Sequence, residues 1–147
     1  MFQGAVSILT EKIHDLALKQ RQSFLLDGTL TNLDKAISNI ERSLSKGRFV
    51  QILYVYQEPS LAWDFAQARE RTEGRKIQAA DFIHQYYSAR QVVNSIKKRY
   101  GSEVHVDLLL KNTDNTPRVY KGNIDMIDYH IPEQYNRREL ELLIQDY

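Results

Sequence analysis

The chain has no cysteine, and neither sign of charge is in excess. Without cysteine among its 147 residues, it can form no disulfide and offers no thiolate as a nucleophile or metal ligand. This composition suits a reducing compartment, and we expect a cytoplasmic protein. Lys and Arg number 20 against 19 Asp and Glu. Such a balance gives no electrostatic reason to expect binding to nucleic acid or to an anionic membrane.

Long hydrophobic runs are missing too. No stretch of about 18 consecutive apolar residues occurs, so we expect no membrane-spanning helix. Charged residues such as Glu11, Lys12 and Asp15 interrupt the first twenty positions, which therefore do not read as a signal peptide. Hydrophobic residues make up 42% and charged residues 27%. These values predict a globular chain with one domain, residues 1–147.

Glycine is scarce, and its neighbours exclude a phosphate-binding loop. A P-loop needs a Gly-Lys pair followed by Ser or Thr, because backbone N–H groups and the lysine hold the phosphates. None of the six glycines is followed by lysine, and no GxGxxG pattern can be drawn. The glycines are Gly4, Gly28, Gly47, Gly74, Gly101 and Gly122.

Strand-like and helix-like segments alternate over the first 110 residues. Buried strands are predicted at 23–27 (SFLLD), 49–56 (FVQILYVY) and 104–110 (VHVDLLL), from their apolar, β-branched and aromatic content. Helical spacing predicts helices at 2–20, 33–44, about 59–68 and 79–100. The predicted apolar stripe of the first helix consists of Ala5, Val6, Leu9, Ile13, Leu16 and Ala17. We therefore predict an α/β fold, a three-layer parallel sheet flanked by helices.

The pattern changes in residues 111–147. Asp114-Asn115 lies between two strand-like segments and predicts a hairpin or an irregular meander. Residues 137–145 have the spacing of a short helix.

The tripeptide Asp27-Gly28-Thr29 ends the first predicted strand. Ligands of open α/β sheets bind beyond the carboxyl ends of the strands. Asp27 could hold a substrate hydroxyl or a metal-bound water, Gly28 would let a ligand approach the backbone, and Thr29 adds a donor and an acceptor. The alternative is an ordinary strand-end turn, in which Asp27 and Thr29 only cap the chain.

Arg69, Arg71 and Arg75 form a second candidate group, beside Gly74 and between two predicted helices. Guanidinium groups bind phosphate oxygens bidentately and can stabilise charge during phosphoryl transfer. This spacing is typical of a mobile lid. The alternative is a solvated face whose arginines pair with nearby glutamates.

The histidines and aromatic residues do not add a third site. The four histidines, His14, His84, His105 and His130, lack the spacing of metal ligands, so we interpret them as structural and expect no metal site. Trp63 and the tyrosines are interpreted as packing residues. Without a basic groove, they do not form a nucleic-acid stacking platform.

Taken in order, these segments resemble the zeta-toxin family of bacterial kinases. The similarity lies in SFLLDGTLTN, NIERSLSKGR, VQILYVYQEPSLAWDFAQARERTEGR and AADFIHQYYSAR. It runs from about residue 2 to residue 110 and is specific as an ordered series. The resemblance implies a P-loop-kinase-like fold and a phosphotransferase of toxin–antitoxin systems. Such enzymes use ATP or GTP with magnesium to phosphorylate UDP-N-acetylglucosamine or related UDP-amino sugars, which poisons cell-wall synthesis.

The resemblance also assigns roles to individual residues. Asp27, Gly28 and Thr29 match the family's acidic-Gly-Thr segment in the sugar-nucleotide pocket. Thr31 stands where the family often has an arginine, so substrate contact there departs from the family pattern. Arg75 matches one phosphate-gripping lid arginine. Either Arg69 or Arg71 matches the other.

The family's P-loop, its magnesium-holding Ser or Thr and its proposed catalytic aspartate all lie upstream of the matching segments. We therefore expect the N-terminal P-loop unit to be absent from these residues. Positioning and electrostatics supply nearly all the catalysis of phosphoryl transfer. It follows that this chain alone should have negligible kinase activity and should not bind ATP or GTP with magnesium tightly.

Two functional hypotheses remain open. The chain could be the C-terminal portion of a UDP-sugar kinase, completed by an upstream P-loop segment and controlled by an antitoxin. Alternatively, it could be a non-catalytic interaction protein or a toxin remnant. A missing strand would leave an open sheet edge, through which a homodimer could form. Nucleic acid and membrane are not expected partners.

Overall fold

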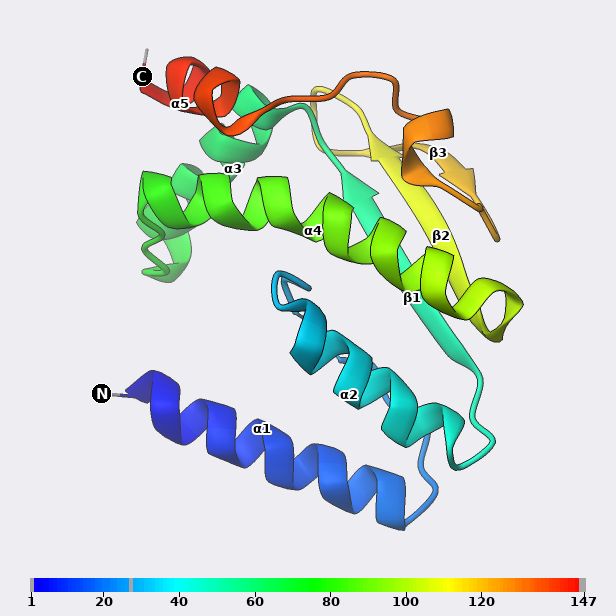
Figure 1. Ribbon diagram of the computed structural model, residues 1–147. Helices are drawn as coiled ribbons and strands as arrows, with labels where there is room; N and C mark the ends of the chain where they lie inside the picture. Colours follow the sequence, from blue (N-terminus) through cyan, green and yellow to red (C-terminus); the bar gives the residue numbers. More distant parts are fainter. Residues whose placement is uncertain (1, 27, 146–147) are drawn as a thin grey trace.

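We describe the chain from a computed structural model, which covers residues 2–26 and 28–145. Within these residues the chain folds into helices and a three-stranded sheet (Figure 1). The elements are α1 (Phe2–Lys19), α2 (Leu33–Leu44), β1 (Val50–Tyr56), α3 (Pro59–Glu73), α4 (Ala79–Tyr100), β2 (Val104–Lys111), β3 (Pro117–Lys121) and α5 (Arg137–Gln145). Short 3-10 turns occupy Gly101–Glu103 and Ile127–Tyr129.

The sheet is mixed, with the strand order β1-β2-β3. β1 and β2 are parallel, and their register places Val50 opposite Val104 and Tyr56 opposite Leu110. α3 and α4 connect these two strands, as expected for a parallel crossover. β3 returns antiparallel to β2, which confirms the predicted hairpin. The α/β class is therefore confirmed, whereas a three-layer parallel sheet is not.

The strand predicted at residues 23–27 is wrong for the part that the structure describes. Ser23–Leu26 forms no helix or strand, and Leu25 is fully exposed at 101%. A strand requires a hydrogen-bonded neighbour. Among the described residues no backbone hydrogen bond joins this segment to β1. Asp27 lies outside the described residues.

The main core lies on one face of the sheet, under α4 and α2 (Figure 1). Val93 and Ile96 of α4 are at most 1% exposed and belong to the same cluster as Val104, Val106 and Leu108 of β2. A smaller cluster joins α3, the first half of α4 and α5. It is built from Trp63, Phe82, Ile83, Leu140 and Ile144.

Helix α1 forms as predicted, but its apolar stripe does not face the core. Val6, Leu9, Ile13 and Leu16 are 61, 58, 58 and 53% exposed. Of the predicted stripe, only Ala17 is buried, together with His14 and Leu18 on the neighbouring flank of the helix. Polar contacts to α2 hold α1 through that flank, namely Arg42 with Asp15 and Lys35 with Glu11.

Local sequence signals fix several helix ends. The side chain of Asn32 accepts a hydrogen bond of 3.0 Å from the Lys35 N–H and caps α2. The carboxylate of Glu58 accepts from the backbone N–H groups of Ser60 and Leu61 and caps α3. Gly74, at φ +68°, ends α3 in the left-handed conformation that favours glycine.

Arg90 connects α4 to the segment before α5. Its guanidinium donates to the carboxylate of Asp128 and to the backbone oxygens of Ile131 and Glu133. The side chains of Arg90 and Asp128 are only 14 and 25% exposed. Removing Arg90 would therefore leave the partly buried Asp128 carboxylate without its charged partner, with only the longer 3.4 Å bond from the Asn94 side chain, and two carbonyls without this donor.

We predict that Arg90→Ala lowers the free energy of unfolding by about 3 kcal/mol, because breaking a desolvated ion pair leaves its partner charge uncompensated. Urea denaturation would measure the change. The matched control is Arg99→Ala on the same helix. Arg99 is 58% exposed and lies 3.9 Å from Glu41, so its loss should cost less than about 1 kcal/mol. Equal costs for the two variants would contradict this role for Arg90.

Candidate functional site

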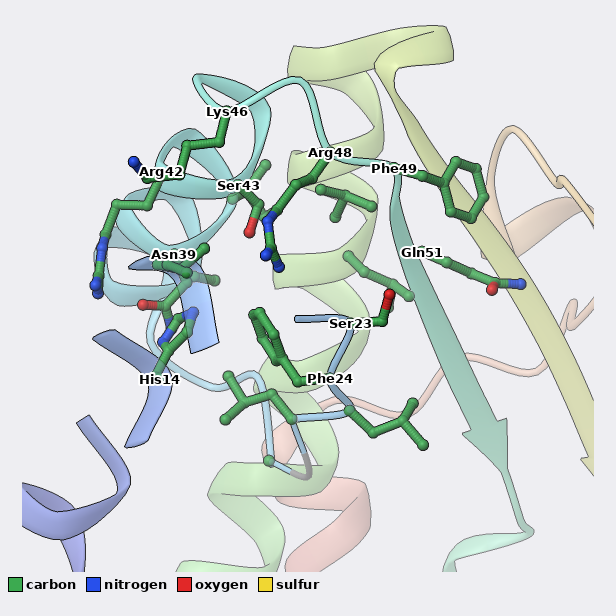
Figure 2. A pocket seen from close by; sticks show the side chains of 18 of the residues that line it. His14, Ser23, Phe24, Asn39, Arg42, Ser43, Lys46, Arg48, Phe49 and Gln51 are labelled. Carbon is green, nitrogen blue, oxygen red and sulfur yellow. The ribbon is translucent and has the colours of Figure 1, made fainter. Parts of the chain in front are cut away.

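A cavity of about 1620 Å³ separates residues 23–26 and 28–30 from the free side of β1. Its walls come from the C-terminal half of α1, from α2, from residues 23–26 and 28–30, and from β1 (Figure 2). Leu53 and Val55 of β1 line it and are 53 and 49% exposed. The cavity therefore lies where a further strand would be needed to join residues 23–26 to the sheet.

Arg48 ties the start of β1 to the end of α1 across this cavity. Its guanidinium donates to the backbone oxygens of Gln22, at 2.8 Å, and Ala17, at 3.2 Å. It also lies 5.5 Å from the centre of the Phe24 ring. Figure 2 shows Arg48 pointing from the β1 side toward Phe24. Because Ala17 lies in the last turn of α1 and Gln22 lies three residues beyond its end, Arg48 fixes how the chain leaves that helix relative to β1.

His14 lies in the cavity wall beside Phe24 (Figure 2). It is 6% exposed, and its ring meets Phe24 edge to face at 4.8 Å. Its Nε2 has no hydrogen-bond partner among the described residues. Burial lowers the pKa of His14, and the nearby Arg42 and Arg48 lower it further. The imidazole is therefore neutral at pH 7.

The rim of the cavity is basic at its α1–α2 end. Lys19, Arg21 and Lys46 line it together with Arg42, whose guanidinium is paired with the carboxylate of Asp15. Asp15 is the one acidic residue among the described lining residues. This end of the cavity consequently favours acidic groups.

The predicted substrate residues lie on the loop that enters α2. Gly28 lines the cavity, and no atom lies within 4 Å of the position that a Cβ would take there. Thr29 is exposed, and its hydroxyl is 3.3 Å from that of Thr31. Asp27, the acidic member of the predicted site, is outside the described residues. The structure thus places Gly28 in the cavity wall. Thr29 and Thr31 follow it on the same loop, with their hydroxyls close together.

The predicted lid arginines lie around the C-terminal end of α3. Arg69 and Arg71 are in its last turns, and Arg75 follows Gly74. All three are exposed, and none is among the described residues that line the cavity. The Nε of Arg75 lies 3.8 Å from a carboxylate oxygen of Glu73, an exposed pair of the kind that the solvated-face interpretation expects. The roles of these arginines stay predictions.

A second pocket, of about 450 Å³, was not predicted from the sequence. It lies between the end of β1, α4 and the segment before α5, and Tyr54, Tyr56 and Tyr86 line it. The Tyr86 hydroxyl donates to the Gln57 backbone oxygen at 2.7 Å. Burial raises the pKa of Tyr54 to about 12 and also raises those of Tyr56 and Tyr86. These phenols are therefore protonated at neutral pH. The sequence pattern that could have indicated this pocket is the spacing of Tyr54 and Tyr56, which places both on one face of a strand.

Asp107 is the buried carboxylate of the sheet, 4% exposed. It accepts hydrogen bonds from the Gln51 amide, the Tyr120 hydroxyl and the Asn123 backbone N–H. Burial alone would raise its pKa, but these three bonds outweigh that effect and lower it. With its oxygens occupied in this way, Asp107 is a structural link between β2 and the end of β3. Among the described residues no three His, Asp or Glu side chains are grouped to hold a metal ion.

Comparison with known proteins identifies the family. The model of the zeta toxin family matches residues 1–125. The chain belongs to the zeta toxin family. Membership confirms the resemblance read from the sequence and indicates a kinase-like toxin domain. The chain matches no curated protein and no solved structure at a significant level. Within the part of the chain that the structure describes, no helix is long and apolar enough to cross a membrane.

We predict that His14 makes this family member less stable in mild acid. Because the folded pKa lies below the usual value of 6.5, the unfolded chain binds a proton first as the pH falls. The free energy of unfolding should therefore decrease as the pH is lowered from about 7 through 6.5 and below. His14→Phe should remove this part of the pH dependence in urea titrations.

The control for that measurement is His84→Phe, since His84 is exposed on α4. It replaces a histidine that contacts Ser88 and Arg137 rather than the cavity, so His14→Phe should change the pH profile more than His84→Phe does. A His14→Phe variant with the same pH profile as the unaltered chain would show that His14 is not responsible.

Proposed function

We propose that this chain forms the acceptor and lid side of a zeta-type kinase that phosphorylates a UDP-amino sugar such as UDP-N-acetylglucosamine. The consequence in the cell would be poisoned cell-wall synthesis. The observation that carries this proposal is the family match over residues 1–125. The ordered sequence of Asp27-Gly28-Thr29 and the Arg69–Arg75 group within that range supports it.

The loop from Gly28 to Thr31 is the segment that would contact the sugar nucleotide. Gly28 has open space around its Cα, which lets a ligand approach the backbone closely. The hydroxyls of Thr29 and Thr31 are neighbours at 3.3 Å and can both donate and accept hydrogen bonds to a sugar or a phosphate. Arg69, Arg71 and Arg75 would supply guanidinium groups to phosphate oxygens.

The residues of this chain do not fit a complete ATP–magnesium or GTP–magnesium site. No glycine is followed by lysine, so the backbone cradle of a P-loop cannot form from these residues. The described residues also contain no group of three carboxylate or histidine side chains suited to a metal ion. We therefore expect the kinase reaction only when a P-loop segment from outside these residues supplies the nucleotide site.

The cavity beside β1 is where we propose that such a segment docks. The edge of β1 that faces the cavity carries no backbone partner among the described residues. Its sequence, VQILYVY, contains no charge or proline to protect it from pairing. A strand placed there would pair with the free edge of β1 and bring its own side chains beside Leu53 and Val55. An antitoxin that occupied the same cavity would keep the enzyme incomplete.

A non-catalytic interaction protein is the second candidate function. The observation that favours it is the amount of uncovered apolar surface, which includes the stripe of α1 and the free side of β1. Contiguous apolar patches on a soluble domain usually mark interaction sites. Under this proposal the chain would bind a partner through those surfaces without any sugar nucleotide.

Isothermal titration calorimetry of the purified chain with UDP-N-acetylglucosamine tests the first proposal. We predict weak binding, with a dissociation constant on the order of 1 mM, because only part of the site is present. Thr29→Val should weaken it roughly tenfold by removing one hydroxyl at constant shape. The matched control is Thr10→Val, because Thr10 lies on α1 and its hydroxyl donates to the Val6 backbone oxygen at 2.8 Å, away from the loop that carries Thr29.

ATP–magnesium is the second titrant. No heat of binding is expected from this chain alone, and no phosphorylated sugar should appear when both substrates are present. Micromolar binding of ATP would overturn the account of an incomplete nucleotide site. A folded sample that binds neither ligand would reject the acceptor-side proposal and favour the interaction protein.

A further inference from the structure

The two outer strands of the sheet differ in how their free edges are protected. Among the described residues the sheet ends at β1 on one side and at β3 on the other. The sequence of β3, PRVYK, carries a proline and two basic residues, which hinder the addition of a further strand. The sequence of β1, VQILYVY, has neither proline nor charge. The edge of β1 is therefore the one suited to pair with another strand.

The cavity beside that edge contains a positive charge without a counter-ion. Arg48 is half-buried there, and none of the salt bridges between described residues involves it. Its hydrogen bonds go to the neutral carbonyls of Gln22 and Ala17. Asp15, the one acidic residue among the described lining residues, is paired with Arg42 instead. A half-buried guanidinium in this state favours an anionic group from outside.

His14 adds an unused hydrogen-bonding atom at the same end of the cavity. It is 6% exposed, and its Nε2 has no partner among the described residues, which is rare for a buried polar atom. The tautomer with its proton on Nε2 can donate to a carboxylate. The ring of Phe24 lies 4.8 Å from the imidazole and 5.5 Å from the Arg48 guanidinium (Figure 2). The two unused groups thus flank one aromatic ring.

The order of these features along β1 defines the chemistry of a segment that pairs with it. Arg48 precedes Val50, the first residue of β1, by two positions, so an anionic group is favoured beside the start of the strand. Leu53 and Val55 line the cavity further along and are about half exposed. A paired strand brings its side chains beside them. The matching segment is therefore apolar along most of its length and acidic at one end.

We propose that the cavity beside β1 binds an acidic strand from outside these residues. The strand pairs with the free edge of β1 and places apolar side chains next to Leu53 and Val55. At its end beside Val50, it carries a carboxylate that binds Arg48 and His14. This occupant refines the docking at β1 on which the proposed kinase function depends, and it rests on that docking.

Fluorescence polarisation of a labelled synthetic peptide, titrated with the full chain, tests the proposal. In the probe, valine and threonine alternate and glutamates stand at both ends, over a length of about nine residues that spans β1. Its dissociation constant should be on the order of 100 µM, because a single short strand supplies few contacts. The same peptide with lysines in place of the glutamates should bind about tenfold more weakly or worse.

Two results of this titration would overturn the proposal. The first is equal affinity for the glutamate and lysine peptides, because the cavity would then not select an acidic strand. The second is no binding of the glutamate peptide up to about 2 mM, which exceeds the expected dissociation constant roughly twentyfold.

Variants test the residues that would hold the carboxylate. Arg48→Met should weaken binding of the glutamate peptide by about 30-fold, because it removes the counter-charge. His14→Phe keeps an aromatic ring but removes Nε2, and it should weaken binding roughly fivefold. Unchanged affinity in both variants would overturn the assignment of the carboxylate site.

Arg48 and His14 also hold local structure, so an exposed rim residue provides a second test. Lys46→Gln should weaken the glutamate peptide about threefold. The matched control is Lys98→Gln on α4, which is exposed and is not among the described lining residues, and it should leave the affinity unchanged. Circular dichroism melting would show that all variants remain folded. Equal affinities for the Lys46→Gln and Lys98→Gln variants would contradict the role of the basic rim.

Amide hydrogen exchange locates the bound peptide on the sheet. The glutamate peptide should slow exchange in β1, whose free edge it pairs with, and leave β3 unchanged. Slower exchange in β3 without a change in β1 would place the peptide at the opposite edge and overturn the proposal.

UDP-N-acetylglucosamine separates this proposal from the kinase function. Thr29→Val should weaken the sugar nucleotide and leave the peptide unaffected, because Thr29 is not among the described lining residues. A chain that binds the sugar nucleotide but not the peptide would reject the acidic strand and leave the kinase proposal standing. If Arg48→Met and His14→Phe weaken the sugar nucleotide but not the peptide, the anion is a phosphate, and the carboxylate assignment is wrong.

Discussion

The pairing of β1 with β2 beneath α4 is the interaction on which the rest of the structure depends. β2 has a neighbour on both edges, and Val104, Val106 and Leu108 are at most 1% exposed beneath α4 and its neighbours. At about 25 cal/mol per Å² of apolar surface removed from water, this cluster supplies the main driving force for folding. α1 is tied to α2 by the pairs Arg42–Asp15 and Lys35–Glu11, and Arg48 ties the end of α1 to the start of β1.

Among the described residues the sheet ends at β1, and the two faces of this strand differ in burial. One face of β1 contributes Ile52 to the core, whereas Leu53 and Val55 on the other face remain about half exposed. The edge has no described partner, and the cavity next to it is bounded by the loop that carries Gly28. A zeta toxin family chain without a P-loop thus has its proposed substrate loop beside an incomplete sheet. The kinase proposal concerns the cavity and the free edge beside β1.

Much of the local structure could be predicted from the sequence. The β-branched and aromatic runs at 50–56 and 104–110 form strands because each finds a partner. The helix predicted at about 59–68 was correct in kind but too short, since α3 continues to Glu73 and includes Arg69 and Arg71. Ser23–Leu26 has a similar composition but fails to form a strand, because strand formation depends on a neighbour that composition does not reveal. The stripe of α1 was correctly predicted as helical, but helical spacing alone does not reveal which neighbour covers a stripe, and most of this one is exposed.

The candidate site could be predicted only in part. Gly28, which lines the cavity, was singled out because it follows a strand-like run and resembles a family motif, whereas Thr29 is not among the described lining residues and its role stays a prediction. His14, Arg48 and the tyrosine pocket were missed, since their importance arises from contacts between distant segments. Arg48, for example, reaches carbonyls that lie 26 and 31 positions earlier, and no spacing rule anticipates that. Asp107 lies within a predicted strand, and only the structure shows that its oxygens are occupied.

Amide hydrogen exchange followed by NMR tests the central claim most directly, namely that the sheet ends at β1 and leaves residues 23–26 unpaired. The amides of Val104, Val106 and Leu108 should be among the slowest to exchange, because they lie at the centre of the paired sheet. The amides of residues 23–26 should exchange without measurable protection. Protection of residues 23–26 comparable to that of β2 would mean that the segment forms a fourth strand, and it would contradict the account.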